Sequence, residues 1–237
     1  PQTARLLCFC KPDQAVALAE KIVIVQRDHG NRANRANARL KYTIDTHGLG
    51  WFRNEVENLL GYDLEEARPY KFESRGDRYG WIKGIDNKWH YTLYISSGRV
   101  ADTETTQYKT GLREIAQVHK GDFRLTCNQN LIIGAVAEED KAEIDALIMK
   151  YALDHHEKMS GLRLNSISCV ALPTCGLALS ESERYLPDLI TDLDKVIEAN
   201  GLISDEIVIS MRGCPNGCGR PFLAEIGFVG KNYNTYN

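Results

Sequence analysis

Four cysteines in the carboxyl-terminal third constrain this chain more than any other feature of its sequence. Cys169 and Cys175 are separated by five residues, Cys214 and Cys218 by three, and 38 residues lie between the two pairs. Two pairs of thiolates carried by two loops suit either a tetrahedral metal ion or a four-iron cluster. The fold must therefore bring two separate loops together around one site.

The residues around these cysteines favour an iron–sulfur cluster, with zinc and an incidental grouping as alternatives. Paired ligands of structural zinc are usually about two to four residues apart, whereas the first pair here is wider and lies in the apolar segment CVALPTCGLAL. Burial and amide hydrogen bonds to sulfur set the potential of a cluster, so a cluster gains from apolar wrapping. Pro215 after Cys214 also occurs in ferredoxin-type motifs. Gly213, Gly217 and Gly219 lack a Cβ and let backbone amides approach sulfur.

Composition excludes several other classes of protein. The chain has 237 residues, a net charge of −3 and seven cysteines. An odd number of cysteines without a secretion signal argues against a disulfide framework. The charge implies no nucleic-acid partner, and no apolar run is long enough to cross a membrane, so we expect a cytoplasmic protein. Because the chain begins with Pro1, we also expect a fragment or a processed piece.

The three cysteines outside the two pairs are expected to be structural or incidental. Cys8 and Cys10 are too close together for a common ligand motif. Cys127 lies in an apolar strand pattern, which predicts a small core residue.

The amino-terminal part is expected to be helical. Residues 14–28 have apolar side chains at helical spacing and are followed by Gly30, and WFRNEVENLLG forms a second amphipathic segment. If a helix continues between them, Arg32, Arg35 and Arg39 share one face. That face is either solvated or an anion site for a carboxylate or phosphate ligand.

Between residues 66 and 90 the chain changes to Gly, Asp and aromatic residues, which indicates a boundary or an ordered functional loop. A strand with a turn, a helix, a strand and a helix then follow, over 90–100, 106–121, 122–136 and 138–155. This order indicates a compact α+β unit.

In the cysteine region, Ser180 and Glu183 predict a capping box ahead of a helix that Gly201 ends. That helix carries an apolar stripe, expected to be core, at Leu186, Leu189, Ile190, Leu193, Val196 and Ile197. The segment DEIVISMRG predicts a strand that leads directly into the glycine–cysteine loop, and PFLAEIGFVG predicts the next strand.

The segments CVALPTCGLALSESERYLP and MRGCPNGCGRPFLAEIGFVG together resemble the siroheme and 4Fe-4S nitrite and sulfite reductases. GDRYGWIKGIDNKWHYTLYI and HKGDFRLTCNQNLIIGAV look like the second half-repeat of that family. The resemblance implies an α+β fold in which a ferredoxin-like half-module precedes a cluster- and siroheme-binding α+β domain. It divides the chain into a mainly helical end of the preceding module with a linker (1–74), the ferredoxin-like half-domain (75–150) and the cluster-binding domain (151–237), which we expect to be cut short at its carboxyl end.

The resemblance also implies roles for individual residues. Cys169, Cys175, Cys214 and Cys218 would bind the 4Fe-4S cluster, and Cys218 would also bridge to the siroheme iron and so take part in catalysis. Asn216 would lie near the cluster or the siroheme, or serve only as a turn residue. Arg124 would line the far side of the siroheme or be structural. The arginines at 32, 35 and 39 would meet the carboxylates of siroheme.

The activity implied is the six-electron reduction of sulfite to sulfide at a coupled siroheme and 4Fe-4S centre, in sulfate assimilation. Gly217, Gly219–Arg220 and Ala224–Glu225 favour the sulfite over the nitrite members of the family. Electrons would come from a flavoprotein subunit that uses NADPH, or from ferredoxin in a nitrite or sulfite reductase of that kind. The basic residues that hold sulfite lie in the first half of such proteins, so we expect no activity from this chain alone. A zinc-stabilised binding module and a cofactor-free fragment are the alternatives.

Overall fold

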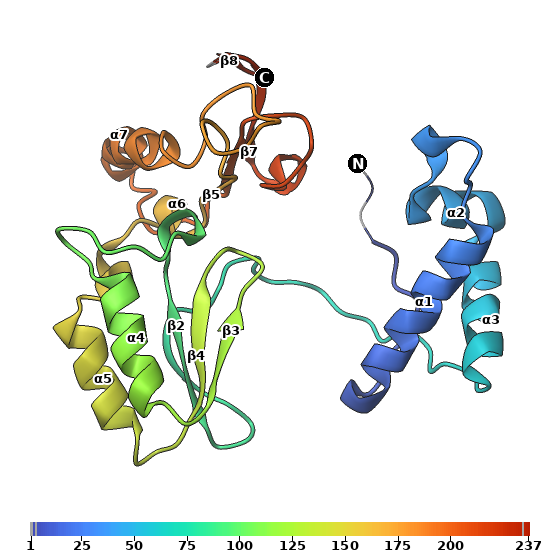
Figure 1. The fold of residues 1–237 in the computed structure, drawn as a ribbon, viewed down its shortest axis with the longest axis horizontal. Helices are drawn as coiled ribbons and strands as arrows, with labels where there is room; N and C mark the ends of the chain where they lie inside the picture. The colour runs from blue at the N-terminus through green and yellow to red at the C-terminus, as the bar shows by residue number, and fades with distance from the viewer. Residues whose placement is uncertain (1, 3, 234) are drawn as a thin grey trace. The chain divides into compact units, whose positions relative to one another are not determined.

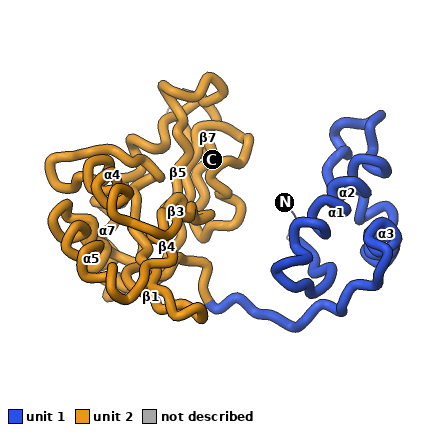
Figure 2. Tube along the Cα trace, turned by 60° about the horizontal axis from the view of Figure 1, so that its bottom comes forward, with its two compact units in different colours: residues 1–73 blue, residues 74–237 orange. Residues whose placement is uncertain are grey.

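The structure is a computed structural model that describes residues 2, 4–233 and 235–237. The chain divides into two compact units, residues 1–73 and residues 74–237, which Figure 2 colours separately. Within the described residues, no helix is both long and apolar enough to span a membrane.

The first unit is built from helices around a small apolar core. Its elements are η1 (Pro12–Gln14), α1 (Ala15–His29), η2 (Arg35–Asn37), α2 (Leu40–His47) and α3 (Leu49–Leu60). The residues buried between them are Leu18, Val25, Phe52, Val56 and Leu64. The two helices that the sequence predicts here are confirmed as α1, which Gly30 ends, and α3.

The expected basic face at Arg32, Arg35 and Arg39 is not formed as predicted. The backbone leaves the helix after His29, and α2 begins only at Leu40, so no continuous helix joins the three arginines. Asn31 accepts hydrogen bonds from the backbone N–H groups of residues 33 and 34, at 3.1 and 2.8 Å. Such an asparagine turn competes with helical hydrogen bonding, which is why the helix does not continue.

The first part of the second unit is an antiparallel sheet with two helices on one face (Figure 1). The strand order is β1 (Gly80–Lys83), β2 (Trp89–Leu93), β4 (Leu131–Val136) and β3 (Asp122–Leu125). The helices α4 (Tyr108–Val118) and α5 (Lys141–Lys150) pack on one face through Ile115, Ile144 and Ile148, which meet Leu93 and Ile133 of the sheet. The predicted helices of this part are confirmed.

The segment 122–136 is a hairpin rather than the single strand that its apolar alternation suggests. β3 ends at Leu125 and β4 begins at Leu131, with a turn between them. The hydroxyl of Thr126 accepts hydrogen bonds from the N–H groups of Asn128 and Asn130 and stabilises this turn. Cys127 lies in the turn and is exposed, so the prediction of a core residue there is wrong.

The second part of this unit is a mixed sheet. β6 (Ile209–Arg212) lies between β5 (Ile167–Ser168) and β7 (Ile226–Asn232) and runs parallel to both, and β8 (Thr235–Tyr236) pairs antiparallel with β7. The helices α6 (Gly161–Leu164) and α7 (Leu186–Ala199) pack on this sheet. Three short 3-10 turns complete the unit, namely η3 (Ser96–Gly98), η4 (His155–Lys158) and η5 (Pro221–Leu223). The fold is therefore α+β, as expected.

The expected capping box at Ser180 and Glu183 is not present. Helix α7 begins later, at Leu186, and its N-cap is Tyr185. The Ser180 hydroxyl instead donates to the backbone oxygen of Asn232, at 2.6 Å, and Glu183 forms an ion pair with Arg99. Both side chains bind partners that are far away in the sequence, and a local motif cannot predict such contacts.

Candidate functional site

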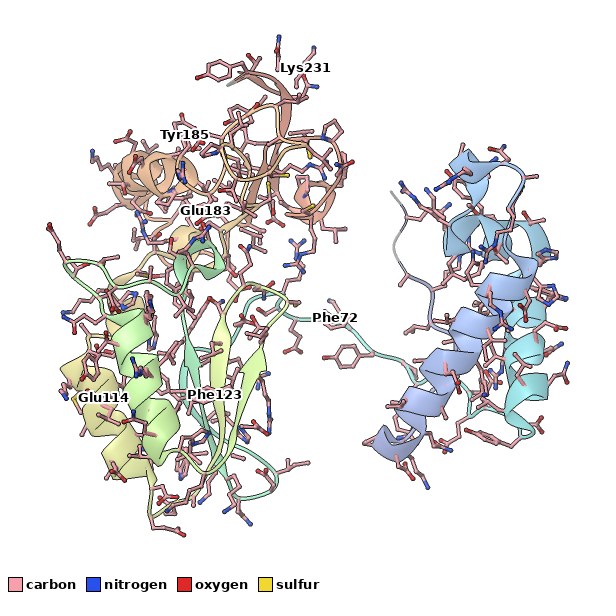
Figure 3. All side chains as sticks on the ribbon, viewed as in Figure 1. Phe72, Glu114, Phe123, Glu183, Tyr185 and Lys231 are labelled. Atoms are coloured by element: carbon pink, nitrogen blue, oxygen red, sulfur yellow. The ribbon has the colours of Figure 1, made fainter. Side chains whose placement is uncertain are left out.

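The parallel pairing of β5 and β6 brings the two cysteine loops together. Ser168 at the end of β5 is the register partner of Met211 in β6. Cys169 follows β5 directly, and Cys214 follows β6 after one glycine. Because the carboxyl ends of parallel strands lie at the same edge of a sheet, both loops begin side by side. Sulfur atoms are drawn in yellow in this part of the second unit in Figure 3.

Hydrogen bonds tie one cysteine loop to the other. The N–H of Gly213 donates to the sulfur of Cys169, at 3.3 Å between nitrogen and Sγ. The carbonyl of Gly213 accepts from the N–H groups of Leu179 and Ser180, at 2.6 and 3.1 Å. An N–H that points at sulfur stabilises the thiolate form, which is the form that binds a metal or a cluster.

Two glycines are required by this packing. A Cβ on Gly213 would come within 2.8 Å of the Cβ of Ala171, which is too close for the loops to stay in place. Gly217 has a φ of +93°, and a Cβ there would lie 3.0 Å from Nη1 of Arg212. Gly217 also favours the sulfite members of the family in the resemblance. The positive φ of the backbone at this position is a second reason for a glycine there.

The four cysteines differ in exposure. Cys214 is buried with 7% of its surface exposed, Cys169 and Cys175 are half-buried, and Cys218 is exposed. None of them forms a disulfide. Within the described residues, no three His, Cys, Asp or Glu side chains are grouped so that they could hold a metal ion. The four thiols therefore do not converge on a single point.

Arg212, the last residue of β6, is fully buried beside these cysteines with 0% of its surface exposed. Its three guanidinium nitrogens have no hydrogen-bond partner among the described residues. Burial lowers the pKa of Arg212, while the thiols of Cys214, Cys169 and Cys218 act in the opposite direction. An unpaired buried cation among thiols fits an anionic group, and thiolates bound to a cluster are such a group.

The hairpin turn between β3 and β4 holds the backbone next to Cys169. The side-chain amide of Gln129 donates to the carbonyl of Ser168 at 2.7 Å and accepts from the N–H of Ser168 at 3.3 Å. Arg220 donates to the side chain of Asn128 at 2.8 Å. The sheet part thus supports both cysteine loops through one turn.

A second bridge between the two parts of this unit is an ion pair. Arg99, which follows η3, meets the carboxylate of Glu183 with two hydrogen bonds of 2.5 and 2.7 Å. Figure 3 labels Glu183 near α6, where the two parts come together. The backbone N–H of Glu183 also donates to the carbonyl of Cys169 at 3.2 Å. The first cysteine loop is therefore held at its far end as well.

Apolar side chains are exposed around the cysteines. They lie in the loop between Cys169 and Ser180 and in η5. The exposed residues are Val170, Leu177, Leu179, Phe222 and Leu223. A group of exposed apolar side chains beside a polar site is typical of a surface that another domain or a ligand covers.

The two other predicted cofactor-binding residues lie at different places in the second unit. Asn216 is exposed in the turn between Cys214 and Cys218. Arg124 is on β3, is 49% exposed and makes a two-point ion pair with Asp122, which raises the pKa of Arg124.

Arg124 lines a hollow of 230 Å³ on the sheet face opposite α4 and α5, together with Arg78 and His90. Register explains this grouping, since Arg124 is paired with Ile132, which is paired with Thr92. The hollow is not formed by the cysteine loops. Arg124 is therefore not brought together with the four cysteines as one cluster of side chains.

Cys8 and Cys10 lie in the first unit, half-buried against its apolar core. Burial is the main reason why the pKa of Cys8 is raised, followed by the neighbouring Cys10. Cys8 thus has the surroundings of a packed thiol rather than of a reactive one.

Three functional positions were missed by the sequence analysis or given another role. Arg212 was included only in a strand pattern, and Ser180 was assigned to a cap. A charged residue at the end of an otherwise uncharged strand was the available signal for Arg212. Nothing local indicates that Gln129 contacts Ser168, because the two residues are brought together only by tertiary packing.

Two parts of the chain match models of known protein families. A family model described as the nitrite and sulphite reductase 4Fe-4S domain matches residues 1–64. A second one, described as the nitrite/sulfite reductase ferredoxin-like half domain, matches residues 82–151. The four cysteines at 169–218 lie outside both matched ranges.

Over its 237 residues the chain is 56% identical to the sulfite reductase (NADPH) hemoprotein beta-component of Anoxybacillus flavithermus. It is 58% identical to the protein of that name from Geobacillus thermodenitrificans and 54% identical to that from Bacillus subtilis. All of this chain is covered, but only 41% to 42% of each relative.

Among solved structures, the chain is similar to the NirA protein of Mycobacterium tuberculosis, with a TM-score of 0.77 and 25% identity. The match covers 96% of this chain and 41% of that one. The chain thus spans about two fifths of the length of the proteins that it matches.

Proposed function

Because the chain belongs to the nitrite and sulfite reductase family, we propose that it is the part of a sulfite reductase that holds the 4Fe-4S cluster and one side of the siroheme. The complete protein would reduce sulfite to sulfide with electrons from a flavoprotein subunit that uses NADPH. The observation that carries this proposal is the meeting of the two cysteine loops at one sheet edge, with the Gly213 N–H on the sulfur of Cys169.

The residues present fit a cluster better than a zinc ion. The Gly213 N–H that points at the sulfur of Cys169 is the kind of amide contact that sets the potential of a cluster. The buried, unpaired guanidinium of Arg212 also fits a negatively charged group. Cys8 and Cys10 are only two thiols and lie in the other unit, so they do not supply a ligand set.

Cys169, Cys175, Cys214 and Cys218 would bind the cluster, and the exposed Cys218 would also reach the siroheme iron. When bound, the cluster and the siroheme would pass electrons one at a time to the substrate. The chain itself contributes the amide hydrogen bond from Gly213 to the sulfur of Cys169, and its exposed apolar residues would exclude water once they are covered. Asn216 lies in the same loop at the surface, and Arg124 would face the siroheme from the open face of the sheet.

Cysteine substitution tests the ligand set in the full-length gene product that contains this chain. Cys175→Ser is expected to reduce acid-labile sulfide to near zero and to remove the cluster's share of the bound iron and of the visible absorption. Cys127→Ser is the matched control, because Cys127 is exposed in a turn outside the set. If the wild-type protein is colourless and contains zinc, the zinc-stabilised binding module replaces this proposal.

The substrate and the electron donor are tested with the same protein. Purified enzyme is assayed with sulfite and with nitrite, each with the NADPH flavoprotein and with reduced ferredoxin. Preference for sulfite with the flavoprotein is expected. Preference for nitrite or for ferredoxin would support the alternative reductase instead. The cytoplasmic location stays a prediction from the sequence.

A further inference from the structure

Arg212 is a buried charged residue beside the cysteines, and the ligand set does not explain its place in the fold. It ends β6, directly before Gly213 and Cys214, and its side chain is fully buried. Burying a cation costs several kcal/mol of desolvation free energy unless nearby charges or hydrogen bonds compensate it. Its guanidinium nitrogens have no such partner among the described residues.

Other partly buried arginines of this chain do have partners. Arg53 forms ion pairs with Glu57 and Glu66, each at 2.8 Å. Arg163 is paired with Asp194 at 2.8 Å. Arg212 therefore departs from the way this chain otherwise accommodates a guanidinium group.

The surroundings of Arg212 show where compensation can come from. The guanidinium carbon lies 4.5 Å from the ring centre of Phe222, which covers it on one side. Gly217 lies against Nη1, where a Cβ would come within 3.0 Å. Arg212 lies two residues before Cys214 and directly precedes Gly213, whose N–H donates to the sulfur of Cys169.

We propose that Arg212 is a positioning residue of the cofactor site, whose guanidinium compensates the negative charge of the cysteine thiolates and of the cluster that they bind. This rests on the proposed function. One electron from the external donor adds one negative charge to the cluster, so a cation fixed beside the thiolates favours the reduced form. Gly217 leaves room for that cation, and Phe222 shields it from water.

Removing the charge of Arg212 is expected to be favourable in the cluster-free protein and unfavourable in the cluster-loaded protein. Without a cluster, the guanidinium is a buried charge with no hydrogen-bond partner among the described residues, so Arg212→Met is expected to raise Tm. With a cluster, the same substitution is expected to lower the equilibrium constant for one-electron reduction about tenfold, which is about 59 mV. It is also expected to speed the release of iron to a chelator.

The experiment uses the full-length gene product in cluster-free and cluster-loaded form, with iron and sulfide content, potentiometric titration and Tm as measurements. Arg212→Lys keeps the charge and is expected to retain most of the wild-type potential. Arg163→Met removes an arginine that has an ion pair, and it is expected to lower Tm in both forms and leave the potential unchanged. If Arg212→Met does not fold, Arg212→Gln replaces it with the same expected shift.

An unchanged potential in Arg212→Met at equal cluster content overturns the inference, and so does a cluster-free variant that is less stable than the wild type. Failure of both neutral variants to fold counts as that second result. If instead the wild-type protein binds no iron and sulfide, the proposed function itself fails. The two failures are therefore distinguishable.

Discussion

The two parts of the second unit differ in how many apolar and polar side chains they bury. The part formed by β1 to β4, α4 and α5 has an apolar core of twelve buried residues, whereas the core between α7 and the second sheet has five. The cysteine part buries more polar side chains than the sheet part, where Thr92, Thr106 and Asn130 are buried. The buried polar side chains of the cysteine part are Ser160, Ser168, Ser180, Ser182, Ser210 and Arg212.

From this difference we infer that the sheet part serves as a scaffold and the cysteine part as a binding site. The larger core can stabilise the sheet part by burial alone, because each buried aliphatic side chain contributes about 1.5–3 kcal/mol. The cysteine part has fewer such residues, and it exposes Leu177 and Phe222 beside the thiols. We therefore expect that the cysteine part depends on a bound group for much of its stability, since a ligand that binds only the folded state stabilises it.

The largest effect is expected in the core of the sheet part. Ile133 is fully buried in β4, opposite Tyr91 and Phe123. Ile133→Ala should lower the free energy of unfolding by about 2–5 kcal/mol, because it removes apolar contacts and leaves a cavity. Denaturant titration with and without bound cluster measures this. Ile85→Ala, at an exposed turn, is the control. If the variant and the wild type have the same free energy of unfolding once the cluster is bound, the sheet part is not a scaffold that is stable independently of the cofactor site.

Gly213→Ala is expected to have an intermediate effect on stability and a large one on the site. The added Cβ would come within 2.8 Å of Ala171, and the resulting overpacking should cost about 1–3 kcal/mol. Since the loops must separate, iron and sulfide content should fall as well. Gly176→Ala is a matched control in the same loop region, because a Cβ there would meet no atom within 4 Å. Equal iron content in both variants would show that the loop contact is unimportant for binding.

The smallest effect is expected at the turn that joins the two parts. Gln129→Leu removes both hydrogen bonds to the backbone of Ser168, and should lower the free energy of unfolding by about 1–2 kcal/mol. Because Ser168 precedes Cys169, we expect faster loss of iron to a chelator as a second result. Gln117→Leu, exposed on α4, serves as the control. If cluster release is unchanged in Gln129→Leu, the sheet part holds the cysteine part without orienting its thiols.

Much of the scaffold could be predicted because its information is local. The apolar spacing of α1, α3, α5 and α7 is set by residues within one helix, so a periodic pattern is enough. The hairpin at 122–136 was missed because apolar alternation continues on both sides of a polar turn, and the hydrogen bonds of Thr126 define that turn only in the folded chain. Arg32, Arg35 and Arg39 were placed on one helix because the turn at Asn31 was not recognised.

The sequence by itself determined which groups are available to a cofactor, since the spacing of Cys169, Cys175, Cys214 and Cys218, with glycines between them, already indicates two loops around one site. Only the tertiary structure decided how those loops meet, because the parallel register of β5 and β6 depends on residues that are far apart in the chain. The same holds for Arg212, whose burial without a partner cannot be read from its neighbours in sequence. Chemical identity is local, but burial and pairing are properties of the whole fold.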